Sequence, residues 1–159
     1  MKKYGLFVDA IGTLVNDEHI LKKTLYNDAK IFLNEIKSRR LENITLITGI
    51  ITNCGNEIHN ILKSFKIQEC FDHIICSDDA HALKPSKIIF HYAANEAQLK
   101  PQHMFFIGDS LHNDALGAKI AGMTGIWLNR GNANLGDFTP QCSSLMDSLE
   151  IIKKIINNN

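Results

Sequence analysis

Three aspartates in this sequence occupy positions where carboxylates could do chemistry. Asp9 directly follows the apolar run Tyr4 to Val8, and Asp109 follows the run Met104 to Ile107 with one glycine between them. Asp114 comes five positions after Asp109. Carboxylate oxygens are the ligands that Mg²⁺ prefers, and such sites keep room for waters and a phosphate oxygen. The three residues therefore predict a divalent-metal site, with Asp9 as a candidate nucleophile.

The residues around these aspartates leave simpler interpretations open. In the segment Asp9-Ala10-Ile11-Gly12-Thr13-Leu14, the glycine lets the chain turn tightly and the hydroxyl of Thr13 can bond to the loop backbone. An Asp after an apolar run, taken alone, more often serves as a turn or cap residue. Asp114 by itself could be a charge at a helix start that complements the helix dipole. Only the aspartates taken together favour a metal site.

The elements that must position these residues follow from the apolar pattern. Short apolar runs that end in polar or small residues indicate buried strands, and spacing of three to four residues indicates helices. The expected strands are 4–8, 44–47, 73–76, 104–107 and 125–128, and the expected helices are 24–39, 56–65, 86–97, 113–121 and 144–156. Alternating strands and helices predict the α/β class: a three-layer, mainly parallel, Rossmann-like sheet with helices on both faces.

In such a sheet, ligands bind beyond the carboxyl ends of the strands, where loops and helix N-termini converge. The polar residues that follow the expected strands thus become candidate site residues. They are Asp9, Thr48, Ser77 to Asp79, and Asp109.

Size and composition narrow the class of protein. With 159 residues, 45% of them hydrophobic, the chain is expected to form one domain, 1–159. Acidic and basic residues both number 17, so no net charge favours nucleic acid or an anionic membrane. The four cysteines lack paired short spacing and are expected to be reduced packing thiols. A cytoplasmic protein without a membrane span is therefore expected.

The motifs together resemble the haloacid dehalogenase (HAD) superfamily. Asp9 to Leu14 resembles its first motif, Thr48 the end of its second, Lys84-Pro85 its third, and Gly108 to Asp114 its fourth. The following segment, Ala115 to Met123, is typical of the helix after the fourth motif. The resemblance covers about residues 4–130, nearly the whole domain.

This resemblance implies a phosphatase-like hydrolase with a defined site. Asp9 would attack phosphorus and form an aspartyl-phosphate, which divides a difficult hydrolysis into two easier steps. Mg²⁺ would be held by the Asp9 carboxylate, the backbone carbonyl of Ile11 and Asp109, with Asp114 as a further ligand or as a partner of the ligands. Thr13, Thr48, Gly49 and Lys84 would bind the phosphate of a small-molecule substrate, and Lys84 would offset its charge.

One position departs from the family pattern. Phosphatases of this superfamily have a second Asp two residues after the nucleophile, which protonates the leaving oxygen and then activates water. Here that position is Ile11, which can do neither, so slow turnover of alkyl phosphates is expected. Replacement acids could come from the following loop, at Asp17, Glu18 or His19, or from His112.

Two other functions stay open at this point. The dehalogenase branch has an aromatic residue at the position of Ile11 and uses no metal, so a metal-free hydrolase in which Asp9 attacks carbon is one alternative. Its fourth motif lacks the Gly-Asp start of Gly108-Asp109, which argues for phosphate chemistry instead. A catalytically weak binding or regulatory protein that keeps the fold is the other.

The segment 15–24 is where larger relatives insert a helical cap that selects substrate and excludes water. Only about ten residues remain there, so the cap is expected to be vestigial and the site open. Relatives of this type often use a neighbouring subunit as a lid, which makes a homo-oligomer plausible. The segment 144–156 is expected to be a C-terminal amphipathic helix docked on the body.

Overall fold

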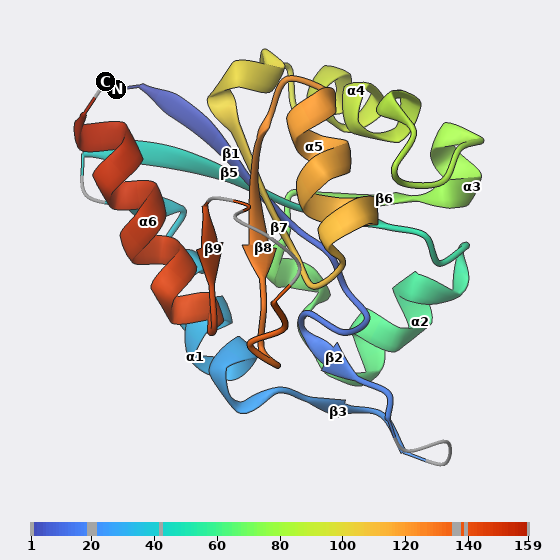
Figure 1. Cartoon of the computed structure of the whole chain (residues 1–159). Coiled ribbons are helices and arrows are strands. Elements are labelled where there is room, and N and C mark those ends of the chain that lie inside the picture. Colours follow the sequence, from blue (N-terminus) through green and yellow to red (C-terminus); the bar gives the residue numbers. More distant parts are fainter. Residues whose placement is uncertain (1, 19–21, 42, 135–137, 139, 159) are drawn as a thin grey trace.

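A parallel sheet organises the chain in a computed structural model that describes residues 2–18, 22–41, 43–134, 138 and 140–158. Its strands are, in spatial order, β4 (Arg40–Leu41), β5 (Ile44–Thr52), β1 (Lys3–Val8), β7 (Met104–Gly108), β8 (Thr124–Leu128) and β9 (Gln141–Cys142), and β6 (His73–Cys76) also pairs with β5. Among the described strands of this sheet, β4 alone is antiparallel to its neighbour. The expected α/β class with a mainly parallel sheet is confirmed (Figure 1).

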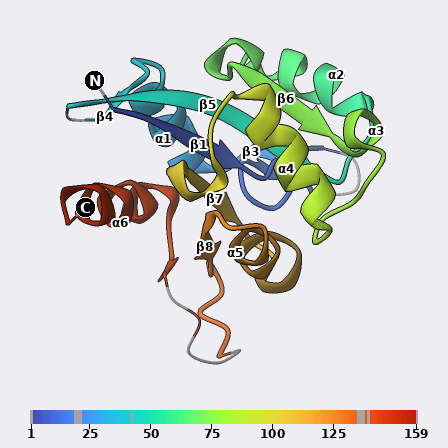
Figure 2. The same ribbon diagram turned by 90° about the horizontal axis from the view of Figure 1, so that it is seen from above.

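Helices cover both faces of this sheet, as Figures 1 and 2 show. One face packs against α1 (Asn27–Ile36), α2 (Glu57–Ser64) and α6 (Leu145–Asn157), and the other against α3 (Ser77–Ala80), α4 (Lys87–Glu96) and α5 (Gly117–Ile120). Short helical turns lie at η1 (Gln68–Cys70), η2 (Pro101–His103) and η3 (Leu111–Leu116), of which η3 is π-helical. None of the helices in these described ranges combines the length and apolar character that a membrane crossing requires.

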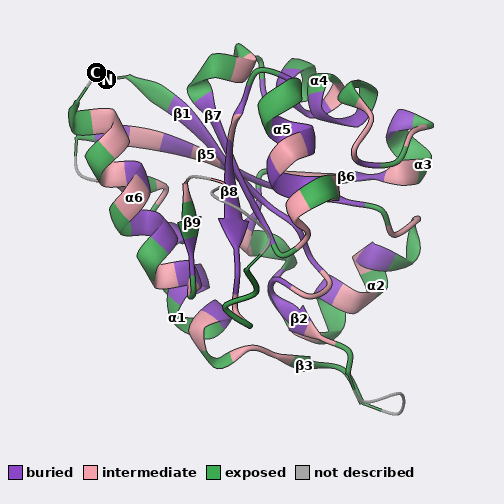
Figure 3. Ribbon diagram, in the orientation of Figure 1, coloured by how far each residue is buried: buried purple, intermediate pink, exposed green. Residues whose placement is uncertain are grey.

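Alternation along the central strands assigns side chains to the two faces. In β1, Leu6 and Val8 join the core under α1 and α6, whereas Phe7 joins the core under α4. The same alternation in β7 sends Ile107 to the first core and Phe106 to the second. Figure 3 shows buried residues along the central strands, and β1 is buried along almost its whole length.

The strand β5 is longer than the sequence predicted, and the predicted end at Ile47 is wrong. Thr48 is fully buried, and its hydroxyl donates to the carbonyl of Cys70 (2.9 Å) and can also bond the Asp72 carboxylate (3.1 Å). Gly49 lies under the ring of Phe7, since a Cβ there would come within 2.2 Å of that ring. The strand continues past both residues to Thr52 because the Thr48 hydroxyl is hydrogen-bonded inside the sheet and Gly49 leaves room for the Phe7 ring.

The segment after the first motif, expected to be a vestigial cap, forms a small antiparallel pair of strands. Its strands are β2 (Val15–Asn16) and β3 (Thr24–Leu25), and residues 19–21 between them lie outside the described ranges. Helix α1 consequently begins at Asn27, three residues after the predicted start. The short elements β4, β9 and α3 were not predicted.

An ion pair joins three parts of the chain that are far apart in sequence. The guanidinium of Arg130, just after β8, binds both carboxylate oxygens of Asp28 in α1 (2.7 and 2.9 Å). It also donates to the carbonyl of Thr13 (2.9 Å) and stacks over the ring of Tyr26, 4.2 Å from its centre. The Asp28 carboxylate also accepts from the backbone of Leu145 at the start of α6 (2.9 Å).

This ion pair predicts a pH dependence of stability. Burial opposes ionisation of Asp28, but hydrogen bonds from Arg130 and Leu145 outweigh it and hold its pKa below the usual value. Its contribution is therefore present above the unfolded pKa, about 3.9, and is lost as the pH falls through the lower folded pKa. Asp28→Asn should lower the unfolding free energy at pH 7 by about 1–3 kcal/mol and flatten its fall between about pH 4 and 2.

Denaturant unfolding of the wild type and of Asp28→Asn measures this effect. The measurements run from about pH 2 to about pH 7, a range that includes the ordinary pKa of Asp. Glu96→Gln, an exposed change on α4, is the matched control and should leave the curve unchanged. Parallel pH curves for wild type and Asp28→Asn would contradict the assignment.

Candidate active site

Three carboxylates meet at the carboxyl ends of the two central strands. Asp9 follows β1, Asp109 follows β7, and Asp114 lies in η3. One oxygen from each lies within 4.8 Å of the others. The two strands are in register, with Val8 beside Ile107, and the Asp9 amide donates to the carbonyl of Ile107 (2.8 Å). The sheet therefore brings together the three aspartates that the sequence singled out.

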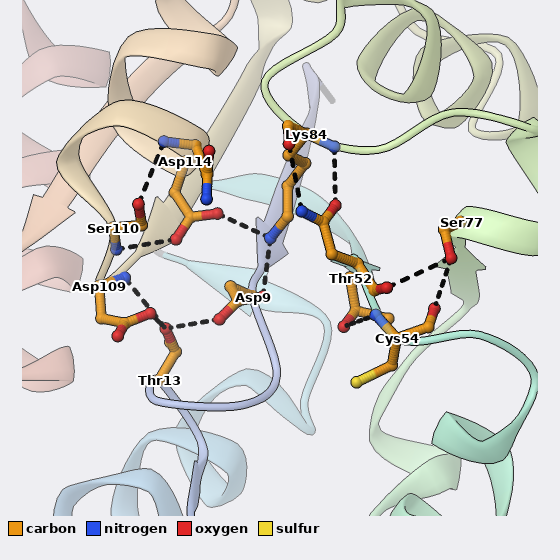
Figure 4. A network of polar contacts seen from close by, with 11 residues as sticks. Asp9, Thr13, Thr52, Cys54, Ser77, Lys84, Asp109, Ser110 and Asp114 are labelled. Carbon is orange, nitrogen blue, oxygen red and sulfur yellow. Dashed lines mark hydrogen bonds and ion pairs between the residues drawn. The ribbon is translucent and has the colours of Figure 1, made fainter.

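Lys84 lies between two of these carboxylates, as Figure 4 shows. Its Nζ is 2.7 Å from Oδ1 of Asp9 and 2.7 Å from Oδ1 of Asp114, and its side chain is only 3% exposed. The ammonium group also lies 5.1 Å from the centre of the Phe106 ring. A buried lysine with two anionic partners is held in one place, so its charge is fixed beside the nucleophile candidate.

Thr13 joins the loops that carry Asp9 and Asp109. Its hydroxyl accepts from the backbone amide of Asp109 (3.2 Å) and lies within donating distance of Asp9 Oδ2 (3.3 Å) and Asp109 Oδ1 (3.4 Å). Thr13 is fully buried, so it lies beneath the carboxylates. Gly12 next to it has a φ of +86°, and a Cβ there would meet the Asp109 carboxylate at 2.3 Å. Only glycine allows this close approach.

Asp114 is positioned by the backbone of the fourth motif. Its Oδ2 accepts from the Ser110 amide (2.9 Å) while Oδ1 faces Lys84. A Cβ at Gly108 would come within 2.3 Å of this carboxyl group, so the glycine leaves the space that Asp114 fills. Asp114 therefore acts as more than a charge at a helix start, because its side chain is buried and bonded at both oxygens.

A recess of about 550 Å³ opens over the carboxylates. The hairpin, the end of β5, α2 and the fourth motif contribute to its walls. Its lining residues are Asp9, Ile11, Asp17, Lys23, Thr52, Asn53, Cys54, Glu57, Ile61, Lys84, Asp109, Ser110, Asn113 and Asp114. The hairpin residues Asp17 and Lys23 lie at its rim and are exposed, so the recess is open to solvent on that side.

Thr52 lies at the recess, where the sequence predicted Thr48. Thr52 ends β5 and lines the recess, whereas Thr48 lies four residues upstream, about 13 Å along the strand. The predictions that Thr48 and Gly49 bind phosphate are therefore corrected, because both are inside the sheet and absent from the lining. The missed signal was the second apolar pair, Ile50-Ile51, followed by Thr52-Asn53. Thr13, also predicted to bind phosphate, lies beneath the recess rather than in its lining.

Of the replacement acids considered for Ile11, the structure brings Asp17 into the recess. Glu18 lines a second recess of about 320 Å³ on the other side of Asp109, together with Tyr26 and Arg130. His112 is exposed and is in the lining of neither recess. His19 lies outside the described residues.

Burial sets the protonation of this cluster. It raises the pKa of Asp9, against the opposing charge of Lys84, and raises the pKa of Asp114 to about 6. Burial also raises the pKa of Asp109, and the neighbouring charge of Asp114 adds to this effect. For Lys84 burial acts in the opposite direction, but Asp9 and Asp114 outweigh it and raise the pKa. The lysine is therefore an ammonium ion at neutral pH.

The donor set fits a hard divalent cation. Three carboxylates face a single ammonium group, so negative charge is in excess when all four are ionised. Asp109 is the exposed member of the three and faces the recess, and its carboxylate lies 3.4 Å from the Thr13 hydroxyl. Oxygen ligands with excess negative charge and access to water are what Mg²⁺ requires.

Comparison with known proteins identifies the family. The family model described as haloacid dehalogenase-like hydrolase matches residues 3–128, which is most of the chain and includes Asp9, Lys84, Asp109 and Asp114. The chain therefore belongs to the haloacid dehalogenase-like hydrolases.

Individual relatives agree with this assignment. The chain is 35% identical over 151 residues to a Saccharomyces cerevisiae protein described as uncharacterized, and 35% identical over 94 residues to the glyceraldehyde 3-phosphate phosphatase of Pyrococcus furiosus. These alignments cover 85% and 58% of this chain but 49% and 39% of the relatives. The crystal structure of a HAD phosphatase from Thermococcus onnurineus superposes with a TM-score of 0.74 at 28% identity, covering 82% of this chain and 59% of that one. The chain thus spans about half the length of the curated relatives it matches, or less.

The two threonines of β5 provide a direct test of the corrected site. Thr48→Val removes a buried hydroxyl and its hydrogen bond to the Cys70 carbonyl, so it should lower the unfolding free energy by about 1–3 kcal/mol without changing the kcat of folded protein. Thr52→Val is expected to lower kcat by about tenfold or more, because it changes the lining beside Asp9. Turnover of an aryl phosphate and denaturant unfolding of both variants make the comparison. A loss of kcat in Thr48→Val equal to that in Thr52→Val would restore the original assignment.

Proposed function

We propose that this protein is a Mg²⁺-dependent phosphohydrolase that acts on a small phosphorylated compound through an aspartyl-phosphate on Asp9. The observation that carries the proposal is the pairing of Asp9 with Lys84, 2.7 Å apart at the floor of an open recess, with Asp109 and Asp114 beside them. A carboxylate in this position can attack phosphorus while the fixed ammonium offsets the charge that accumulates. The phosphatase names of several relatives support the same chemistry.

The reaction divides into two displacements at phosphorus. In the first, an Asp9 oxygen forms a bond to phosphorus and the leaving oxygen departs with the electrons of the broken P–O bond. In the second, water attacks the same phosphorus and passes a proton to the solvent, and the bond between phosphorus and the Asp9 oxygen breaks, which releases inorganic phosphate and restores the Asp9 carboxylate. Lys84 remains protonated throughout and balances the negative charge shared by Asp9 and the phosphoryl oxygens.

Mg²⁺ would be held by the side chains of Asp9, Asp109 and Asp114. The backbone carbonyl of Ile11 would be the fourth ligand from the protein. When bound, the ion would supply positive charge to the phosphoryl oxygens and align the phosphate with Asp9. Thr13 would hold the loop of Asp9 next to the loop of Asp109. Thr52 would face the phosphate from the end of β5.

Ile11 limits which leaving groups depart rapidly. Its side chain lines the recess beside Asp9 and has no proton to give, so the leaving oxygen must depart as an anion or take a proton from elsewhere. Phenolates and carboxylates are weak bases that leave without a proton, whereas alkoxides are strong bases that need one. Aryl and acyl phosphates are therefore the substrate classes that suit this site best.

The first test of the function is turnover of p-nitrophenyl phosphate and acetyl phosphate with Mg²⁺. Asp9→Asn should lower kcat by at least about 10³-fold, because it removes the attacking carboxylate. Chelation of the metal should abolish turnover in the wild type, and readdition of Mg²⁺ should restore it.

Other outcomes of this experiment favour the alternative functions. Hydrolysis of a haloacid that persists with the metal chelated would favour the dehalogenase-type reaction, for which the nonpolar Ile11 is the supporting feature. Mg²⁺ binding without turnover of either phosphate, and no effect of Asp9→Asn, would favour a binding or regulatory protein.

A second prediction concerns the position of Ile11. Ile11→Asp should raise the kcat for an alkyl phosphate by about tenfold to 10²-fold and change aryl phosphate turnover much less, because it restores a general acid. Asp is tolerated at this position because the side chain is only partly buried and faces the recess.

The control for this prediction is Asp17→Asn in both backgrounds. If Asp17 supplies the residual proton, its loss lowers alkyl phosphate turnover in the wild type and has little effect in Ile11→Asp. Equal gains for alkyl and aryl substrates in Ile11→Asp would show that proton supply is not the limitation.

A further inference from the structure

Asn53 makes a two-point contact with the main chain of Lys84. Its Oδ1 accepts from the Lys84 backbone amide at 2.7 Å, and its Nδ2 donates to the Lys84 backbone carbonyl at 3.1 Å. One side-chain amide thus satisfies both polar groups of a single residue, in the way that a neighbouring strand would. Lys84 lies in the loop between α3 and α4, outside the sheet, so no strand partner serves it.

Placement of the Lys84 backbone matters because of what its side chain reaches. Lysine has four rotatable side-chain bonds, and its Nζ must lie 2.7 Å from two different carboxylates. A displacement of the loop would break one of these contacts or bend the side chain out of its preferred rotamers. The fixed position of the Lys84 main chain is therefore part of the geometry at Asp9.

Asn53 is itself held from the opposite side. Its backbone carbonyl accepts from the hydroxyl of Ser77 (3.3 Å), and the same hydroxyl also bonds the carbonyl of Cys54 (3.1 Å). The Cys54 amide in turn donates to the Thr52 hydroxyl (3.2 Å). The end of β5 and the start of α3 therefore form a connected support for the Asn53 side chain, visible around Ser77 and Cys54 in Figure 4.

We infer that Asn53 is a positioning residue for the reaction, which acts by holding the Lys84 main chain so that the ammonium group stays between Asp9 and Asp114. This inference rests on the proposed function for its catalytic consequence. Its structural part, that Asn53 holds Lys84 in place, stands on the two hydrogen bonds.

A double-mutant cycle tests the catalytic part. The kcat and KM for p-nitrophenyl phosphate with Mg²⁺ are measured for wild type, Asn53→Ala, Lys84→Ala and the double variant. Asn53→Ala should lower kcat by about 10- to 100-fold with little change in KM, the loss expected for misplacement of a catalytic group by about 1 Å. In the Lys84→Ala background, the same substitution should have almost no further effect.

Two outcomes of the cycle overturn the inference. One is an equal loss from Asn53→Ala in both backgrounds, especially in KM, since Asn53 would then contact the substrate directly from the recess wall. The other is an unchanged kcat in Asn53→Ala. Asn95→Ala, an exposed change on α4, is the matched control and should leave both constants at the wild-type value.

Chemical labelling of lysines tests the structural part without any need for turnover. In the wild type, Lys84 should resist acetylation by acetic anhydride because its side chain is 3% exposed, while the exposed Lys119 reacts. Asn53→Ala should raise the labelling of Lys84, measured by mass spectrometry, and leave Lys119 unchanged. Continued protection of Lys84 in Asn53→Ala overturns the inference. Increased labelling in a protein that turns over no phosphate would instead leave Asn53 as the support of Lys84 and reject the proposed function.

Discussion

The ammonium group of Lys84 is the interaction on which the site depends. Three carboxylates converge at the ends of β1 and β7, two of them buried, and such a cluster would be costly to hold in the ionised state without a counter-charge. Lys84 supplies that charge to Asp9 and Asp114 at once. Because the lysine is buried with its partners, the pair also fixes where the carboxylate of Asp9 points. The nucleophile candidate is thus oriented by the same contact that favours its ionised form.

Other residues of the site make room for the carboxylates or hold them in place beside Lys84. Gly12 and Gly108 leave space for the carboxylates of Asp109 and Asp114, which any Cβ would fill. Thr13 joins the Asp9 loop to the Asp109 loop, and the Ser110 backbone amide donates to Oδ2 of Asp114. The parallel register of the sheet brings these loops to one edge, so the charge pairing depends on the fold.

The sequence predicted the parts of this arrangement that lie directly at strand ends. Asp9 and Asp109 follow uninterrupted apolar runs, and these runs are the strands β1 and β7, so their positions could be read from the pattern. Thr48 could not be assigned correctly in the same way, because a buried threonine and a glycine interrupt β5 without ending it. Whether a polar residue ends a strand or is satisfied inside it depends on partners such as Asp72, which are distant in sequence.

The roles of Asn53 and Arg130 could not be predicted from the sequence for a related reason. Each acts through contacts with the backbone of another segment, at Lys84 and at Thr13, and such contacts leave no trace in residue type or periodicity. The hairpin of β2 and β3 was expected only as a remnant of a cap. It contributes Asp17 and Lys23 to the recess, so even this short segment places charged groups at the rim beside Ile11.

The contact of Arg130 with Asp28 and Thr13 also has a consequence for how the molecule is made. A ribosome delivers the N-terminal part of a chain first, so β1, the Asp9 loop and α1 leave the exit tunnel early. Their partners at Asp109 and Arg130 lie 96 to 117 residues further along the chain, and Asp114 follows soon after Asp109. The loop that carries Asp9 therefore stays without these partners until the chain has been made beyond Asp114 and Arg130, and a nascent chain lacks its reactive centre until then.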